Sequence, residues 1–166
     1  MQLFRGSGAD WIVIVVFSAP MLIGSYLVYR FNIHKHKKRY AILLLLAAGI
    51  FLLGVKLFEG TTILVLASIA LSSLCLSFAF PLDQAIFSDL QKRTARFKFY
   101  VASLDNLGNS IAYVVGPIIA GLFADNLGYF NTFGALGIFS ILIALFLLII
   151  TPRKIKIPQK ELSELE

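Results

Sequence analysis

Five long apolar segments make up most of this chain, and a membrane bundle is the fold that accommodates them. They cover residues 11–29, 40–58, 61–80, 99–124 and 129–151, and Lys56 and Asp105 are the charged residues inside them. At a helical rise of about 1.5 Å per residue, each segment can cross the ~30 Å hydrocarbon layer of a bilayer. Only 14% of the chain is charged, which is too little to cover the surface of a soluble domain. We therefore expect an all-α membrane protein, with residues 11–151 forming a polytopic bundle of five transmembrane helices.

Positive charge lies on one side of these segments. The first loop, the third loop and the tail hold 13 of the 15 basic residues, and those of the first loop are Arg30, Lys35, Lys37, Lys38 and Arg39. Cytoplasmic loops carry the excess of Lys and Arg in membrane proteins. We therefore expect an extracytoplasmic tail at residues 1–10 and a cytoplasmic tail at residues 152–166, in the plasma or inner membrane of the cell. The same asymmetry explains the net charge of +6 without nucleic acid as a partner.

The fourth apolar segment differs from the others because it combines small and polar residues at helical spacing. Asp105, Asn109 and Tyr113 recur every four residues, and with Asn106 they are candidates for lining a cavity or a gate, since lipid would leave such groups unsatisfied. A second series predicts close helix packing, with the alternative that Gly116 and Pro117 only kink a lipid-facing helix. That series is Gly108, Ala112, Gly116, Pro117, Ala120 and Gly121.

The remaining segments offer fewer candidates. The third segment carries four serines, of which Ser72 is a further cavity-lining candidate, although serine in a membrane helix more often links helices. The second and fifth segments are almost purely aliphatic and aromatic, which predicts outer, lipid-facing helices. Pro81 is expected to end or kink the third helix.

The sequence offers few residues that could act in catalysis or bind a metal. Cys75 is alone inside a segment, and His34 and His36 stand in a lysine-rich loop that disfavours bound cations. Asp105 is the one acidic residue well inside a segment, so the clustered ionisable groups of a membrane enzyme are missing. We expect no enzyme, no metal and no cofactor. A transporter and a self-standing structural or regulatory membrane protein remain as alternatives.

Three motifs carry a resemblance to a known family. GPIIAGLFADNLGYFNTF (116–133), PLDQAIFSDL (81–90) and GSYLVYRFNIHKHKKR (24–39) resemble parts of the C-terminal half of a major facilitator superfamily transporter. The resemblance implies five of that half's six helices, without the seventh helix of the family. It also implies secondary active transport of a small solute, such as a drug, sugar or metabolite, by alternating access. The partner would be the missing N-terminal half, and the chain would be a fragment.

Asp105 has three interpretations at this stage. Burial would raise its pKa and suit it to proton coupling. The resemblance instead favours an ion pair that holds the cytoplasmic side closed, with Arg30 as a weaker partner in this chain. The third interpretation is an aspartate that caps the helix or is hydrated at the interface.

Overall fold

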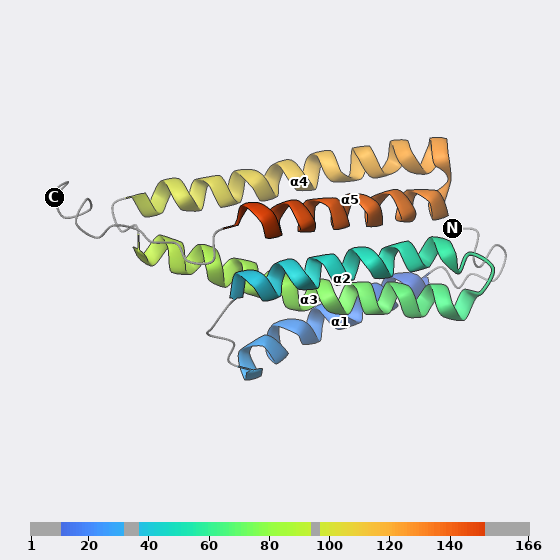
Figure 1. The fold of residues 1–166 in the computed structure, drawn as a ribbon, viewed down its shortest axis with the longest axis horizontal. Coiled ribbons are helices and arrows are strands. Elements are labelled where there is room, and N and C mark those ends of the chain that lie inside the picture. The colour runs from blue at the N-terminus through green and yellow to red at the C-terminus, as the bar shows by residue number, and fades with distance from the viewer. Residues whose placement is uncertain (1–10, 32–36, 94–96, 152–166) are drawn as a thin grey trace.

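The computed structural model describes residues 11–31, 37–93 and 97–151, and these form five helices. Figure 1 shows them lying along the long axis of the molecule, with the turns after α2 and α4 at the same end. The fold class predicted from the apolar segments is therefore confirmed. The tails 1–10 and 152–166 lie outside the described residues. The helices are α1 (Trp11–Phe31), α2 (Lys37–Leu57), α3 (Thr62–Arg93), α4 (Lys98–Leu127) and α5 (Tyr129–Ile150).

Four of the helices, α2 to α5, are long and apolar enough to cross a membrane. The described apolar part of α1 is the shorter segment Trp11–Gly24, so the fifth crossing remains a prediction. In hydrocarbon every backbone polar group needs an internal partner, which a helix supplies from its own chain. A chain with four such helices is a multi-pass membrane protein.

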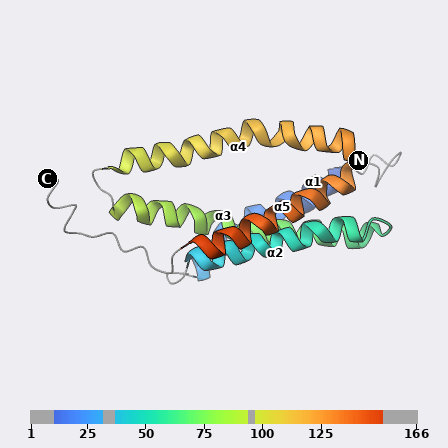
Figure 2. The ribbon, with the colours of Figure 1, turned by 45° about the horizontal axis from the view of Figure 1, so that its top comes forward.

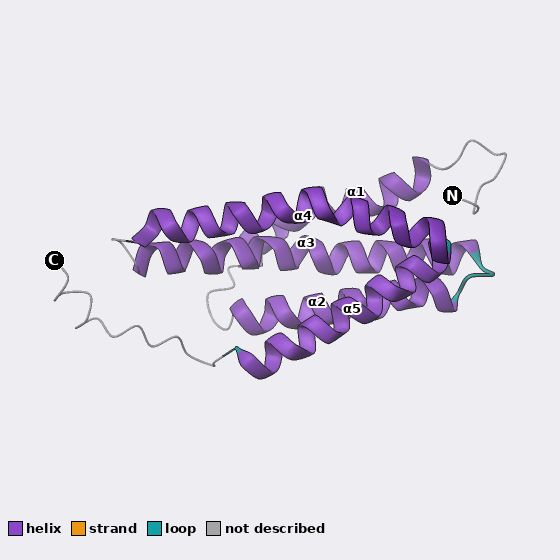
Figure 3. Cartoon of the chain, turned by 90° about the horizontal axis from the view of Figure 1, so that it is seen from above, coloured by secondary structure: helices purple, strands orange, loops and turns teal. Residues whose placement is uncertain are grey.

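Helix α3 does not end at Pro81, which was one of the two outcomes expected from the sequence, but continues to Arg93. A proline inside a helix removes one hydrogen bond, here the one to the Ser77 carbonyl oxygen, and the residues that follow restore the pattern. At a rise of about 1.5 Å per residue, a helix of 32 residues extends about 48 Å, well beyond the hydrocarbon layer. The residues after Pro81 therefore form a helical extension of α3, and Figure 3 shows α3 running the length of the bundle.

The first basic loop is shorter than predicted. Arg30 lies in the last turn of α1, while Lys37 to Arg39 form the first turn of α2; Lys35 falls outside the described residues. Cations at a helix N-terminus are unfavourable because the macrodipole is positive there. The Lys37 ammonium is compensated by the Asp89 carboxylate on the extension of α3, at an Nζ–Oδ2 distance of 2.7 Å.

Helix α3 is the centre of the bundle, with α1 and α2 packed along it. Val65 and Ile69 of α3 form a buried cluster with Val13 of α1 and Val55 of α2. The hydroxyl of Ser73 also donates a hydrogen bond to the Phe17 carbonyl of α1. Apolar contacts and hydroxyl links together hold α1 and α2 to α3.

Helices α2 and α5 approach each other closely, although both were expected to be outer helices facing lipid. An ideal Cβ at Gly137 would lie 2.8 Å from the Gly49 carbonyl oxygen and 2.9 Å from the Leu53 backbone nitrogen. The Ser140 hydroxyl donates to the Leu45 carbonyl oxygen over 3.3 Å. Each of these helices therefore buries one face, and the glycines bring the two backbones together.

A second close approach joins α1 to α3. An ideal Cβ at Gly24 would lie 2.5 Å from the Ser77 carbonyl oxygen, which is the acceptor that Pro81 leaves without a backbone donor. Only a glycine lets α1 come this near. The proline of one helix and the glycine of its neighbour therefore act at the same contact.

Helix α4 stands apart from the other four. Figure 2 shows it arching over the bundle, and none of its 30 residues is buried. It meets α3 near its start and α5 near its end. Gly128 has a φ of +79° and ends α4, with its N–H donating to the Ala124 carbonyl oxygen. This turn leads directly into α5.

Candidate functional site

The candidate site is one face of α4, which we call the polar face and define by Asp105, Asn109 and Tyr113. Two of its residues are in contact at helical spacing: Asn109 Nδ2 donates to Asp105 Oδ1 over 3.3 Å. Tyr113 is 80% exposed, so nothing described in this chain covers it. A carboxylate, an amide and a phenol thus follow one another along about two turns of the helix.

The polar face is turned towards the bundle rather than away from it. The half-buried residues of α4 lie at its two ends and share the side of the helix on which Asp105 and Gly116 stand. Between them, residues 107–119 are exposed on all sides. Helix α4 therefore faces the bundle but touches it only near its ends. The half-buried residues are Val101, Ala102, Asp105, Ala120 and Ala124.

A backbone acceptor adds to this face. Pro117 has no N–H, so the Tyr113 carbonyl oxygen lacks its usual helical donor. In a membrane such a freed carbonyl is satisfied by a neighbouring helix, a hydroxyl or water. The middle of α4 accordingly offers both side-chain and main-chain groups to whatever lies against it.

Asp105 has an acidic neighbour in α3. Its carboxylate lies close enough to that of Asp83 for the two to repel each other. Within the described ranges no cation forms an ion pair with Asp105, and Arg30 is exposed at the end of α1. The pairing with Arg30 considered from the sequence is therefore not formed in this structure.

The other two predicted cavity residues, Asn106 and Ser72, lie in different parts of the bundle. Asn106 is exposed on α4, a quarter of a turn from Asp105. Ser72 lies elsewhere: it is 1% exposed, and its hydroxyl donates to the Ala48 carbonyl oxygen of α2 over 3.1 Å. In this structure Ser72 links α2 and α3, which is the commoner role of serine in membrane helices.

The small residues predicted for helix packing have no partner helix among the described residues. An ideal Cβ at Gly108, Gly116 or Gly121 would meet no atom within 4 Å. Ala112 and Pro117 are exposed, and Ala120 is half-buried near the end of α4. Their packing role remains a prediction that requires a helix from outside this part of the chain.

Sequence reasoning missed the ion pair between Lys37 and Asp89. It treated Lys37 as an orientation signal and Asp89 as part of a surface segment, because the two are 52 residues apart. The one available signal was an aspartate on an otherwise basic side. In the described part of the chain, no three His, Cys, Asp or Glu side chains gather to hold a metal ion.

One comparison with known proteins gives a match. A sequence model described as Major Facilitator Superfamily matches residues 4–164, which include all five helices. No curated protein and no solved structure matches the chain.

Proposed function

Because the chain belongs to the major facilitator superfamily, we propose that it forms the C-terminal half of a secondary active transporter, with five of that half's six helices. The transporter moves a small solute, a drug, sugar or metabolite, by alternating access of two halves around a central site. The partners are the lipid bilayer, the solute and the missing N-terminal half. This role involves no enzymatic step.

The observation that carries the proposal is the uncovered polar face of α4. Lipid would leave the Asp105 carboxylate and the Asn109 amide with no hydrogen-bond partner except each other, and an ionised carboxylate is costly to place in hydrocarbon. Asp105 finds only Asn109 and the repelling Asp83 within the described residues. A second bundle that encloses a water-filled path against α4 satisfies these groups and gives the solute a polar lining.

The proposal predicts different water access on the two sides of α4. We expect cysteines at Asn109 and Tyr113, in a Cys75→Ser background, to react with a charged thiol reagent in membranes. A cysteine at Ile111 is the matched control, because it lies at the same depth on the opposite face. Reaction at the first two positions should be roughly tenfold faster or more, since thiolates form in water and not in hydrocarbon.

Equally slow reaction at all three positions would contradict the transporter proposal. It would support the alternative of a self-standing structural or regulatory membrane protein whose α4 faces lipid. Bound solute or an assembled second half should also protect Tyr113→Cys while leaving Ile111→Cys unchanged.

The charge asymmetry supports an orientation with the start of α2 and the end of α3 in the cytoplasm. Arg39 and Lys92 are exposed at this end, whereas Glu59 and Asp125 lie at the other. We expect Asn126→Cys to be labelled by an impermeant reagent from outside intact cells, and Ser88→Cys only after permeabilisation. The reverse pattern would contradict this topology.

A further inference from the structure

Helices α3 and α4 are longer than the helices beside them. Helix α3 has 32 residues and α4 has 30, whereas α2 has 21 and α5 has 22. At a rise of about 1.5 Å per residue, α2 and α5 match the ~30 Å hydrocarbon layer, and α3 and α4 exceed it by roughly 15 Å. Figure 1 shows the end of α3 and the start of α4 extending past the ends of the other helices. We call this part, residues 84–93 and 97–104, the α3–α4 projection.

The projection carries exposed positive charge. Lys92 near the end of α3 and Lys98 at the start of α4 are both exposed, and neither forms an ion pair with a carboxylate in the described part of the chain. The acidic residue of the projection, Asp89, is paired with Lys37. The next carboxylate along α4, that of Asp105, is about 10 Å from Lys98 along the helix axis. The tip of the projection therefore attracts anions.

Exposed aromatic side chains lie next to Lys98. Phe99 is 73% exposed and Tyr100 is 70% exposed. The Lys98 ammonium lies 5.1 Å from the centroid of the Phe99 ring, and the rings of Phe97 and Tyr100 are 6.3 Å apart. Tyrosine is enriched where hydrocarbon meets the lipid headgroups, because its ring is apolar and its hydroxyl is polar. Cations beside exposed rings therefore fit the polar layer of a bilayer better than they fit bulk water.

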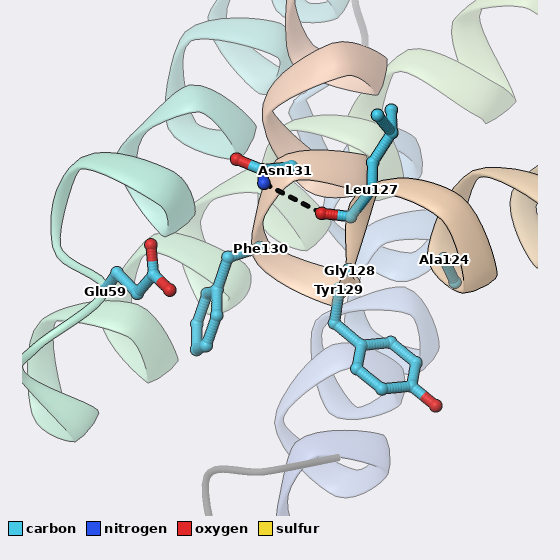
Figure 4. A pocket seen from close by; sticks show the side chains of 7 residues that line it. All are labelled: Glu59, Ala124, Leu127, Gly128, Tyr129, Phe130 and Asn131. Atoms are coloured by element: carbon cyan, nitrogen blue, oxygen red, sulfur yellow. Dashed lines mark hydrogen bonds between the residues drawn. The ribbon is translucent and has the colours of Figure 1, made fainter.

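The opposite end of the bundle has the opposite sign of charge. Figure 4 shows Glu59 on the turn after α2, at the edge of a pocket of about 290 Å³ beside the start of α5. Asp125 and Lys56 are also exposed at this end, so acidic side chains outnumber basic ones among its described residues. An anionic membrane surface is thus attracted to the α3–α4 projection and not to the other end.

We propose that the α3–α4 projection binds anionic phospholipids of the adjacent leaflet, with Lys92 and Lys98 contacting the lipid phosphates. Counting about 20 residues back from Asp125 through the hydrocarbon places Lys98 roughly 10 Å past its edge. The polar layer on each side is about 5–8 Å thick, and the long lysine side chains can turn back into it.

The field of α4 agrees with an anionic ligand at this place. The macrodipole is positive at the start of a helix, and the first turn of α4 holds no acidic residue. The orientation proposed above places the projection at the cytoplasmic leaflet, where anionic lipids are concentrated. Lipid binding here requires insertion in a bilayer but not transport, and it is separate from solute binding on the polar face.

The test measures lipid selectivity beside the projection by fluorescence quenching in vesicles. Trp11→Phe removes the one tryptophan of the chain, and Leu107→Trp, at a position that is 57% exposed, places a single reporter just beyond the projection. Vesicles mix phosphatidylcholine and phosphatidylglycerol, and one of the two carries brominated acyl chains. We expect phosphatidylglycerol to be favoured about fivefold beside the reporter, and about twofold or less in roughly 0.5 M salt, because salt screens the surface charges.

Removing the two cations should remove this preference. Lys92→Gln combined with Lys98→Gln should lower it to below about twofold, and arginine at both positions should keep it. Arg39→Gln is the matched control: Arg39 is an exposed cation on α2 outside the projection, so its loss should change the preference by less than about 1.5-fold. The thermal unfolding midpoints should match that of the parent chain, because all three positions are exposed or half-buried.

Four results would overturn the proposal. Three of them are equal quenching by the two brominated lipids, an unchanged preference in the double glutamine variant, and an equal loss in Arg39→Gln. The fourth is no quenching by either lipid, which would show that a protein rather than lipid covers the start of α4. The thiol reactivity of Tyr113→Cys reports on the transport face separately and is expected to stay unchanged in the lysine variants.

Discussion

Gly137→Leu is expected to separate α2 from α5 and to lower the free energy of unfolding of the chain by roughly 3 kcal/mol. A Cβ at this position would lie 2.8 Å from the Gly49 carbonyl oxygen and 2.9 Å from the Leu53 nitrogen. Both are backbone atoms, so no side-chain rotation relieves the overlap. The helices must move apart, and the Ser140 hydrogen bond to the Leu45 carbonyl is lost with the contact.

The measurement is reversible unfolding of the detergent-solubilised chain, with Gly116→Leu as the matched control. The same substitution at Gly116 meets no atom within 4 Å, so we expect a change below about 0.5 kcal/mol in the chain alone. In the assembled transporter, Gly116→Leu should become disruptive if the second half packs on this stripe. Equal destabilisation of the isolated chain by both variants would contradict the packing described for α2 and α5.

Gly24→Val is expected to release α1 from α3. The added Cβ would lie 2.5 Å from both the Ser77 carbonyl oxygen and the Ser77 hydroxyl oxygen, and valine cannot rotate its branch out of the contact. Because α1 packs chiefly on α3, its displacement also removes the hydrogen bond from Ser73 to the Phe17 carbonyl. We expect a loss of roughly 2–3 kcal/mol and a detached first helix.

Reactivity of a buried thiol distinguishes detachment of α1 from general unfolding. Ser73 is 0% exposed, so Ser73→Cys in a Cys75→Ser background should be protected from maleimide and become reactive when Gly24→Val is added. Gly121→Val is the matched control, since a Cβ at Gly121 meets nothing within 4 Å and both positions are helical. Continued protection of Ser73→Cys in the Gly24→Val variant would show that α1 does not need this glycine.

The helices themselves could be predicted from the sequence because hydrocarbon leaves a backbone few alternatives. Each apolar segment became one helix. The helix end considered at Pro81 was wrong because a proline removes one hydrogen bond but does not stop a helix when the residues after it favour the helical conformation. The length of α3 therefore depended on the residues after the proline and on their contact with Lys37.

The contacts between helices were harder to predict, because sequence spacing describes one helix and packing involves two. The regular small-residue series of α4 marked the expected close approach, yet the close approaches in this chain use Gly49, Gly137 and Gly24. A glycine on both helices, as at Gly49 and Gly137, or on one helix, as at Gly24 against Ser77, brings two backbones together without a periodic signal. Ser72 was ambiguous for the same reason: only the position of α2 shows that its hydroxyl reaches Ala48.

Helix α4 is joined to the bundle differently from the pair formed by α2 and α3. Helices α2 and α3 are joined at one end by the short turn through Glu59 and at the other by the Lys37–Asp89 ion pair, so they are linked at both ends. Helix α4 contacts the other described helices only near its two ends, close to Asp83 of α3 and at the Gly128 turn. Its middle is free to bend at Pro117 without breaking any contact with the other four helices. The helix that carries the polar face is thus the one least tied to the other described helices by side-chain burial.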